Sequence, residues 1–333
     1  MYTRGLAMKC RVSRPAMTFL TAMLPLCLHA APSENSGAAD DSKRMASIRA
    51  LRLDSIPGAM PTYYSPHSEA RAKYLQGLLG GEIAYYSEQF HVDLAPVTMA
   101  VLDAQQWPKV AGDDPYGMPS VNGASPAVFV MPASWKGVTW MVVPSRAEVP
   151  LGMLRKALAN GKKWDQVKFE GCDGIGTHEI GHAIIRQLGI DPQTRWFNEF
   201  LASYAGYAYL KATDPEQALS NEIFWTVGLN KSPHPFTKLD DFESKYDELQ
   251  QTYPGNYGWY QLALDQQVIA IYRQRGLGFL RQVQLRFPRG GPTMNSAQVL
   301  DKLEAISPGW KAWSTLVEAG TITALGSRPV HSP

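Results

Sequence analysis

The sequence has little cysteine, no acidic residue near its start and no hydrophobic run long enough to cross a bilayer. Of its three cysteines, Cys10 and Cys27 lie within the first thirty residues, which leaves Cys172 for the rest of the chain. A single thiol excludes a disulfide framework, and we interpret Cys172 as a small buried residue near a helix start. A spanning helix needs about 20 apolar residues, so stable membrane insertion is excluded.

The first thirty residues have the order of a secretory leader. Four basic residues precede the apolar run Met17 to Leu28, which is followed by small residues. This order predicts a signal peptide over 1–30 and an exported protein, either periplasmic or secreted. Removing it changes the formal net charge from +2 to −2, because 28 basic residues then face 30 acidic ones. The balance does not indicate nucleic acid as a partner, and the arginines between 273 and 289 are interpreted as a solvated helix face.

Composition and periodicity divide the remaining chain into three parts. Residues 31–60 are small and polar, which predicts a flexible linker, with a pro-segment as the alternative. Residues 61–150 predict an α+β lobe with a helix over 67–91, which Gly80-Gly81 would bend, and three strands, VTMAVLD, AVFVMP and VTWMVVP. Residues 151–325 predict a helical lobe of the same catalytic domain. The fold class is therefore α+β, a small mixed lobe with a short sheet packed on a mainly helical lobe.

Turn residues predict where the central helices of the second lobe begin and end. Asp173 is expected to cap a helix that stops at Gly189. Asp191-Pro192 is expected to open the next helix, and Asp214-Pro215 the one after it. The cleft between the two lobes is the default place for a site.

The stretch GTHEIGHAII contains the most informative residues. His178 and His182 are four apart, so on a helix they lie on one face and can bind one metal ion, with Glu179 between them. The chain has only 7 histidines among 333 residues, which makes an accidental H-E-x-x-H improbable. A catalytic zinc needs three protein ligands and one open position, so the third ligand decides the type of site.

The residues that follow distinguish three known continuations. Ile185 and Leu188 stand where a metzincin has glycine and histidine, and the G-T-x-D of an aspzincin is absent. Glu199 follows seventeen residues after His182, within an N-E pair, as in the gluzincin continuation. Apolar neighbours surround Glu199 in the sequence, and a carboxylate buried among them needs a cation.

HEIGH and WFNEFLASY together resemble the zinc-binding core of the gluzincin metallopeptidases, the thermolysin-like and aminopeptidase N-like superfamily. The resemblance covers Thr177 to Tyr207 and, in outline, the helical lobe. It implies a zincin-like fold in which His178, His182 and Glu199 bind Zn²⁺. The sixteen-residue spacer before Glu199 is shorter than the eighteen usual in the aminopeptidases.

The implied reaction is hydrolysis of an amide bond in a peptide or protein substrate by attack of a zinc-bound water. Zinc held by two imidazoles and a carboxylate lowers the pKa of bound water to about 7. Glu179 would accept the proton of this water as general base and return it to the leaving amine. The resemblance further implies an oxyanion-stabilising tyrosine, for which Tyr260 is the first candidate and Tyr257 the competitor. His234 is an alternative donor, although we interpret it as a loop histidine.

The sequence departs from the aminopeptidase N-like pattern in the residues that would bind the substrate. The amine-anchoring glutamate of a G-x-M-E-N stretch is absent, so exopeptidase action is unsupported. AVFVMP, or the loop before it, would instead pair with an extended peptide by strand addition, which suits an endopeptidase or a peptidase of narrow specificity. The alternatives are an exported zinc-binding module without turnover, or a zinc amidase acting on a cell-wall or non-peptide amide.

Overall fold

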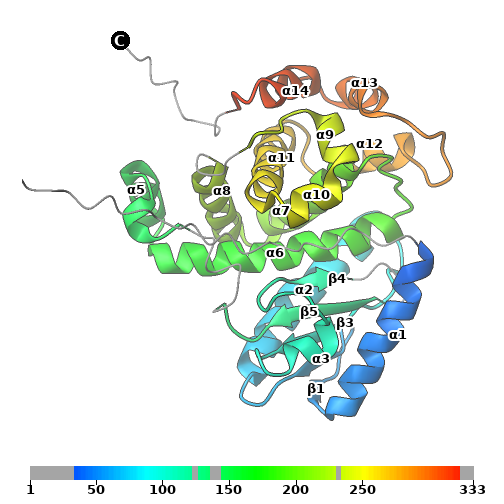
Figure 1. The fold of residues 1–333 in the computed structure, drawn as a ribbon, viewed down its shortest axis with the longest axis vertical. Coiled ribbons are helices and arrows are strands. Elements are labelled where there is room, and N and C mark those ends of the chain that lie inside the picture. Colours follow the sequence, from blue (N-terminus) through cyan, green and yellow to red (C-terminus); the bar gives the residue numbers. More distant parts are fainter. Residues whose placement is uncertain (1–33, 122–126, 136–143, 230–233, 323–333) are drawn as a thin grey trace, which may run out of the picture.

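The protein is described from a computed structural model, which places residues 34–121, 127–135, 144–229 and 234–322. A small sheet lobe precedes a larger helical lobe, and the long helix α6 lies between them (Figure 1). This arrangement confirms the predicted α+β class. None of the described helices is both long enough and apolar enough to cross a membrane.

The sheet lobe contains five strands and the helices that cover them. In chain order the elements are α1 (Glu34–Leu51), β1 (Asp54–Ile56), β2 (Thr62–Tyr64), α2 (Glu69–Phe90), β3 (Thr98–Leu102), α3 (Trp107–Ala111), β4 (Ser120–Val121) and β5 (Val128–Pro132). The strand order is β1-β2-β3-β5-β4. The three central strands are parallel, whereas β1 and β4 pair antiparallel at the edges.

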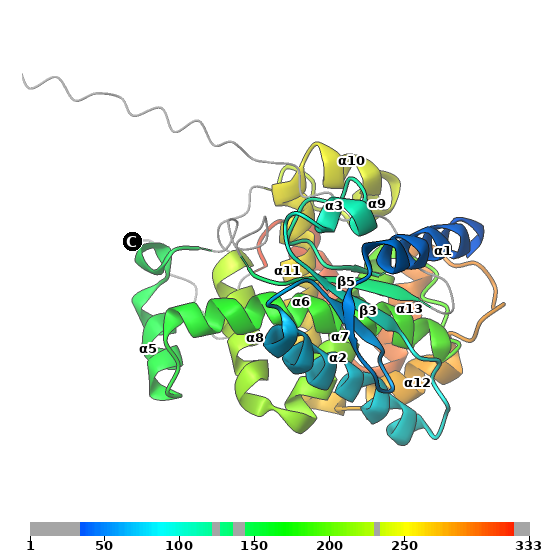
Figure 2. The same cartoon turned by 90° about the horizontal axis from the view of Figure 1, so that it is seen from below.

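Both faces of the sheet are covered, as the alternation of buried side chains along the central strands requires. On one face, Ala100 and Val130 belong to a cluster with Ile48 of α1 and residues of α3. On the other face, Met99 and Phe129 join the main core together with α2 and the helical lobe. The helices α1 and α2 therefore lie on opposite sides of β3 and β5 (Figure 2).

The helical lobe follows without further strands in its described part. After a 3-10 turn, η1 (Arg146–Glu148), its helices are α5 (Leu151–Ala159), α6 (Trp164–Gln187), α7 (Arg195–Thr213), α8 (Pro215–Leu229), α9 (Leu239–Ser244), α10 (Tyr246–Gln251), α11 (Pro254–Arg275), α12 (Gly278–Arg286), α13 (Ser296–Ile306) and α14 (Trp310–Glu318). Asp214 caps α8 as expected, since its carboxylate accepts from the Gln217 amide at 3.0 Å.

The prediction of a flexible linker over 31–60 is wrong. Most of this segment forms α1 and β1, Ile48 is fully buried on the sheet, and Met60 is buried as well. The segment has few apolar residues, but those few meet α3 and the sheet, a contact that local composition does not reveal. The helix α1 covers the sheet face opposite α2 and α6, so it belongs to the folded domain and is not a linker.

The predicted start of α6 at Asp173 is also wrong. The helix begins at Trp164, and Asp173 lies in its middle, fully buried, where it forms an ion pair with Arg71 and accepts from the Trp135 indole at 2.8 Å. Cys172 beside it is buried in mid-helix, and burial raises the pKa of its thiol. The stop at Gly189 is confirmed by its φ of +72°.

Three further predictions concern the start of α7, a bend in α2 and the strands of the sheet lobe. The next helix, α7, begins at Arg195 and not at Pro192, because Glu243 of α9 accepts from the Arg195 and Trp196 amides at 3.0 and 2.9 Å. The helix α2 continues through Gly81, where a Cβ would lie 2.6 Å from the Tyr209 hydroxyl. VTMAVLD and AVFVMP form β3 and β5, and VTWMVVP lies almost entirely outside the described residues.

The helices α6 and α7 pack so closely that their contact requires glycine. A Cβ on Gly181 would overlap the Ala202 carbonyl oxygen, and a Cβ on Gly206 would lie 2.6 Å from the Thr177 hydroxyl. Each glycine therefore admits the backbone of the facing helix, which fixes the spacing between the two elements that carry the candidate ligands.

We expect Gly181→Ala to lower the free energy of unfolding by about 1–3 kcal/mol, the usual cost of overpacking. The matched control is Gly152→Ala in α5, where a Cβ meets nothing within 4 Å, so its stability should stay the same or rise. Chemical denaturation followed by circular dichroism measures both. An unchanged unfolding midpoint for Gly181→Ala would contradict the close approach of α6 and α7.

Glu82 of α2 is a fully buried carboxyl group. Neither of its oxygens has a hydrogen-bond partner among the described residues, and burial raises the pKa of Glu82 well above its usual value. The folded chain therefore keeps a proton that the unfolded chain releases as the pH rises. The free energy of unfolding is therefore higher at low pH, and it falls as the pH rises towards the pKa that Glu82 has in the folded chain.

Replacing Glu82 with glutamine removes this loss. We expect Glu82→Gln to gain stability relative to the wild type as the pH is raised from about 5 to about 8. The control is Glu88→Gln, which removes an exposed carboxylate from the same helix. Urea denaturation across the pH series gives the difference between the two variants, and a difference that does not change with pH would show that Glu82 is ionised in the fold.

Candidate metal centre

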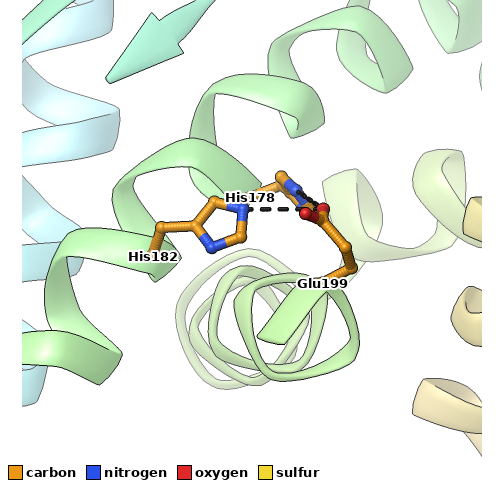
Figure 3. Close-up of side chains that lie close together, drawn as sticks. All are labelled: His178, His182 and Glu199. Carbon is orange, nitrogen blue, oxygen red and sulfur yellow. Dashed lines mark ion pairs between the residues drawn. The ribbon is translucent and has the colours of Figure 1, made fainter. Parts of the chain in front are cut away.

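Two neighbouring helices bring the three predicted ligands together. His178 and His182 of α6 face Glu199 of α7 (Figure 3). The Nε2 atoms of His178 and His182 lie 3.2 and 3.6 Å from Oε2 of Glu199. A tetrahedral zinc site with bonds of about 2.0–2.2 Å separates its ligand atoms by about 3.3–3.6 Å. The two separations from Glu199 are close to these values, and the three candidate ligand atoms all lie within 4.8 Å of one another. The described residues contain no other group of this kind.

The carboxylate of Glu199 is the anionic member of this cluster. Burial by itself would raise its pKa, but the imidazoles of His182 and His178 outweigh burial and hold the pKa of Glu199 well below its usual value. The group is therefore a buried anion that faces two ring nitrogens. Such a charge is costly unless a cation compensates it. Protonated imidazoles can supply that charge, and a metal ion bound between the three groups would supply it when both imidazoles are neutral.

Side chains from α10 and α11 hold Glu199 from behind. The Tyr246 hydroxyl donates to Oε1 at 2.8 Å, and the Gln261 amide donates to Oε2 at 2.9 Å. The Gln261 amide also donates to the Tyr257 hydroxyl at 2.7 Å. These contacts fix the orientation in which Oε2 faces both histidines, and residues in such positions tune metal affinity.

A second chain of hydrogen bonds orients His178. Its Nδ1 lies 2.9 Å from the Ser203 hydroxyl, which is in turn hydrogen-bonded to the buried Asp265 of α11. Burial raises the pKa of Asp265 to about 7, although the bond to Ser203 lowers it. If Ser203 donates to Asp265, it accepts from Nδ1–H of His178, and the Nε2 lone pair then faces Glu199. Two acceptors 3.2 Å apart fit a metal ion between them.

His182 has no corresponding partner. Its Nδ1 is buried without a hydrogen bond among the described residues. The two candidate histidine ligands are thus supported unequally, since His178 is held through Ser203 while His182 is held through the packing of α6 on α7.

Glu179 lies beside the cluster and faces the sheet lobe. It is buried, and the Val121 amide of β4 donates to its carboxylate. Burial raises the pKa of Glu179 to about 7; the charge of Glu199 also raises it, whereas His178 and the Val121 amide lower it. Glu179 is therefore not one of the three residues that face one another, but it lies close enough for the charges of His178 and Glu199 to change its pKa.

The structure does not bring Tyr260 to the cluster. The Tyr260 hydroxyl donates to the Lys238 carbonyl at 2.8 Å. Burial and the charges of Asp241 and Glu318 raise the pKa of Tyr260. None of these three residues is a candidate ligand. The geometry thus gives no support to Tyr260 as the oxyanion donor, because helix α11 turns it towards the Lys238 loop.

The two alternatives to Tyr260 are also engaged elsewhere. Tyr257 is nearer the cluster, but it is fully buried behind Glu199 against Gln261. His234 stacks on the Trp259 ring with centroids 4.4 Å apart. Both residues therefore serve packing or support in this structure.

Sequence patterns had missed the supporting residues. Ser203 had a local signal, because it follows Glu199 by four residues and so shares its helix face. Tyr246, Gln261 and Asp265 had none, since they reach the site from helices 47 or more residues further along the chain. Strand pairing distinguishes the two candidates for strand addition. AVFVMP forms β5, which is flanked by β3 and β4, whereas β4, from the stretch before AVFVMP, lies at an edge of the sheet.

Comparisons of this chain with protein family models, with curated proteins and with solved structures yield no match. Its function therefore has to be inferred from its own residues.

We expect Tyr246→Phe to weaken zinc binding about 10-fold or more, because Glu199 loses the donor to Oε1. The matched control is Tyr260→Phe, which removes a hydroxyl bonded to Lys238 and should leave the affinity unchanged. Competition with a zinc chelator measures both affinities. Equal affinities of the two variants would contradict the supporting role of Tyr246.

Proposed function

We propose that this protein is a zinc-dependent hydrolase, most similar in its chemistry to a gluzincin metallopeptidase, with Glu179 as general base. The observation that carries the proposal is the position of Glu179 beside the His178, His182 and Glu199 cluster, buried and oriented by the Val121 amide. A purely structural zinc site does not need a second carboxylate beside its three ligands.

The three ligands supply the binding half of the site. His178, His182 and Glu199 would hold Zn²⁺ with one position open, which is the ligand set of catalytic zinc sites. A zinc ion bound there lowers the pKa of water and polarises a substrate carbonyl. Tyr246, Gln261 and Ser203 keep the ligand atoms turned to a common point, so little reorganisation is needed when the metal binds.

Glu179 supplies the proton transfers. With a pKa of about 7, its carboxylate can take a proton from water and give it to the leaving amine at neutral pH. Its burial keeps the proton from exchanging freely with bulk water. The bond that breaks is the amide C–N bond, the bond that forms joins the carbonyl carbon to the water oxygen, and the amine leaves with the proton.

The edge of the sheet supports a peptide as the proposed substrate. β4 pairs with β5 on one side and is the last strand in the order, next to α6, which carries Glu179. An extended peptide added beside β4 would pass the cluster, which supports endopeptidase action or narrow specificity. The leader pattern of residues 1–30 supports export to the periplasm or the medium.

We expect Glu179→Gln to retain zinc and to lower peptide cleavage by about 10²–10⁴-fold, the usual contribution of a general base. Asp165→Asn, which changes an exposed carboxylate at the start of α6, serves as control and should cleave as the wild type does. The measurements are metal content by mass spectrometry and cleavage of casein and a peptide library.

The other outcomes identify the alternatives. Wild-type cleavage by Glu179→Gln would contradict the base role. Zinc binding by a wild-type protein that cuts no peptide would favour a binding module, unless cell-wall peptides or simple amides are hydrolysed, which would indicate an amidase.

A further inference from the structure

Arg44 is a buried cation in a helix that covers the far face of the sheet. Its side chain is only 6% exposed, and its guanidinium lies 3.3 Å from the Asp114 carboxylate. It also donates to the carbonyl of Ser120 at 3.4 Å and to the hydroxyl of Ser120 at 3.1 Å, and to the Val128 carbonyl at 3.4 Å. One side chain of α1 thus binds both β4 and β5, together with Asp114 from the segment before them.

The strand that Arg44 binds is short and lies at the edge of the sheet. β4 consists of Ser120 and Val121, which pair with Val130 and Phe129 of β5. Two residue pairs hold an edge strand weakly, so further contacts have to fix its position. Arg44 provides such contacts at Ser120, because its planar fork of donors can bind several acceptors at once.

The next residue of the same strand contacts the proposed general base. The Val121 amide donates to the Glu179 carboxylate, while Ser120 is held by Arg44. Hydrogen bonds at two consecutive residues of β4 therefore connect α1 with α6. None of its members is a ligand of the candidate metal cluster.

We propose that Arg44 is a positioning residue for the active site: by holding β4, it keeps the Val121 amide on the Glu179 carboxylate and so fixes the orientation of the base. This inference rests on the proposed function for the role of Glu179, but its structural part does not. It makes α1 a component of the catalytic apparatus, although α1 lies on the sheet face opposite α2 and α6.

The size of the effect follows from how proton transfer depends on geometry. A displacement of about 1 Å in a catalytic group can cost about 100-fold in rate. Loss of the Arg44 contacts would let β4 move while α6 and α7 keep the ligands in place. The rate of turnover should therefore fall while metal binding does not, and this separation would not be produced by a general loss of stability.

The experiment uses the full chain in the wild-type form and five variants. Glu179→Ala removes the carboxylate that the Val121 amide contacts. Arg44→Gln removes the guanidinium, and Arg44→Lys keeps the charge without the fork. Arg49→Gln is the matched control, since it removes an exposed arginine from the same helix. Because Arg44→Gln removes the cation that faces the buried Asp114 carboxylate, a loss that can unfold a protein, the double variant with Asp114→Asn removes both charges.

Two readouts are compared at equal zinc content. The first is the exchange rate of the Val121 amide with deuterium, measured on folded protein. The second is kcat and KM for a peptide that the wild type cleaves. In Arg44→Gln and in the double variant we expect Val121 to exchange about 10-fold faster or more, and kcat to fall about 10–100-fold with little change in KM. Arg44→Lys should lie between, and Arg49→Gln should equal the wild type.

The outcomes separate this inference from the proposed function. If the folded double variant keeps wild-type exchange at Val121 and wild-type kcat, Arg44 has no positioning role and the inference is overturned. If exchange rises but kcat does not change, the contact is structural only and the catalytic role is overturned. If the wild type cleaves no peptide while Arg44→Gln and Glu179→Ala both accelerate exchange at Val121, the proposed function fails and the path from Arg44 to Glu179 stands.

Discussion

The close packing of α6 on α7 is the constraint on which the candidate site depends. Gly181 meets the Ala202 carbonyl, and Gly206 meets Thr177, so the two backbones approach without intervening side chains. At this spacing, one turn of α6 presents two imidazoles to a carboxylate of α7 at tetrahedral distances. The remaining elements add support to this pair. α10 and α11 hold Glu199 from behind, and the sheet lobe approaches Glu179 through β4.

The buried carboxyl groups of the site have pKa values that are shifted in opposite directions. Glu199 is kept ionised by the two imidazoles, whereas Glu179 and Asp265 are drawn towards the neutral form by burial. Carboxyl groups in different environments can thus take different roles within one small region, one as a ligand, one as a base and one as an anchor for Ser203. Glu82, also buried, lacks a hydrogen-bond partner among the described residues. Its raised pKa makes the free energy of unfolding depend on pH.

The sequence was most informative where the relevant contacts are local. The four-residue spacing of His178 and His182 follows from helical periodicity alone, and Gly189 and Asp214 mark helix ends by their own chemistry. Glu199 was proposed through resemblance, and the geometry brings it to the histidines. Local patterns failed at Asp173, whose carboxylate pairs with Arg71 from the middle of α6. They also failed at Asp191, whose carboxylate accepts from the Gln193 amide before α7 begins at Arg195. They failed more completely for Arg44, because a polar, alanine-rich segment gives no sign that one arginine will reach a strand 76 residues away.

The place of α1 has a consequence for maturation. Export of this chain would require a leader peptidase to cut close to the start of α1, and Ile48 and Arg44 of that helix belong to the folded body. A cut before Glu34 leaves the helix whole. A cut after Arg44 would remove the cation that pairs with Asp114 and two contacts of the edge strand β4. The segment with the composition of a linker would therefore limit how far into the chain a leader peptidase can cut without disturbing the fold.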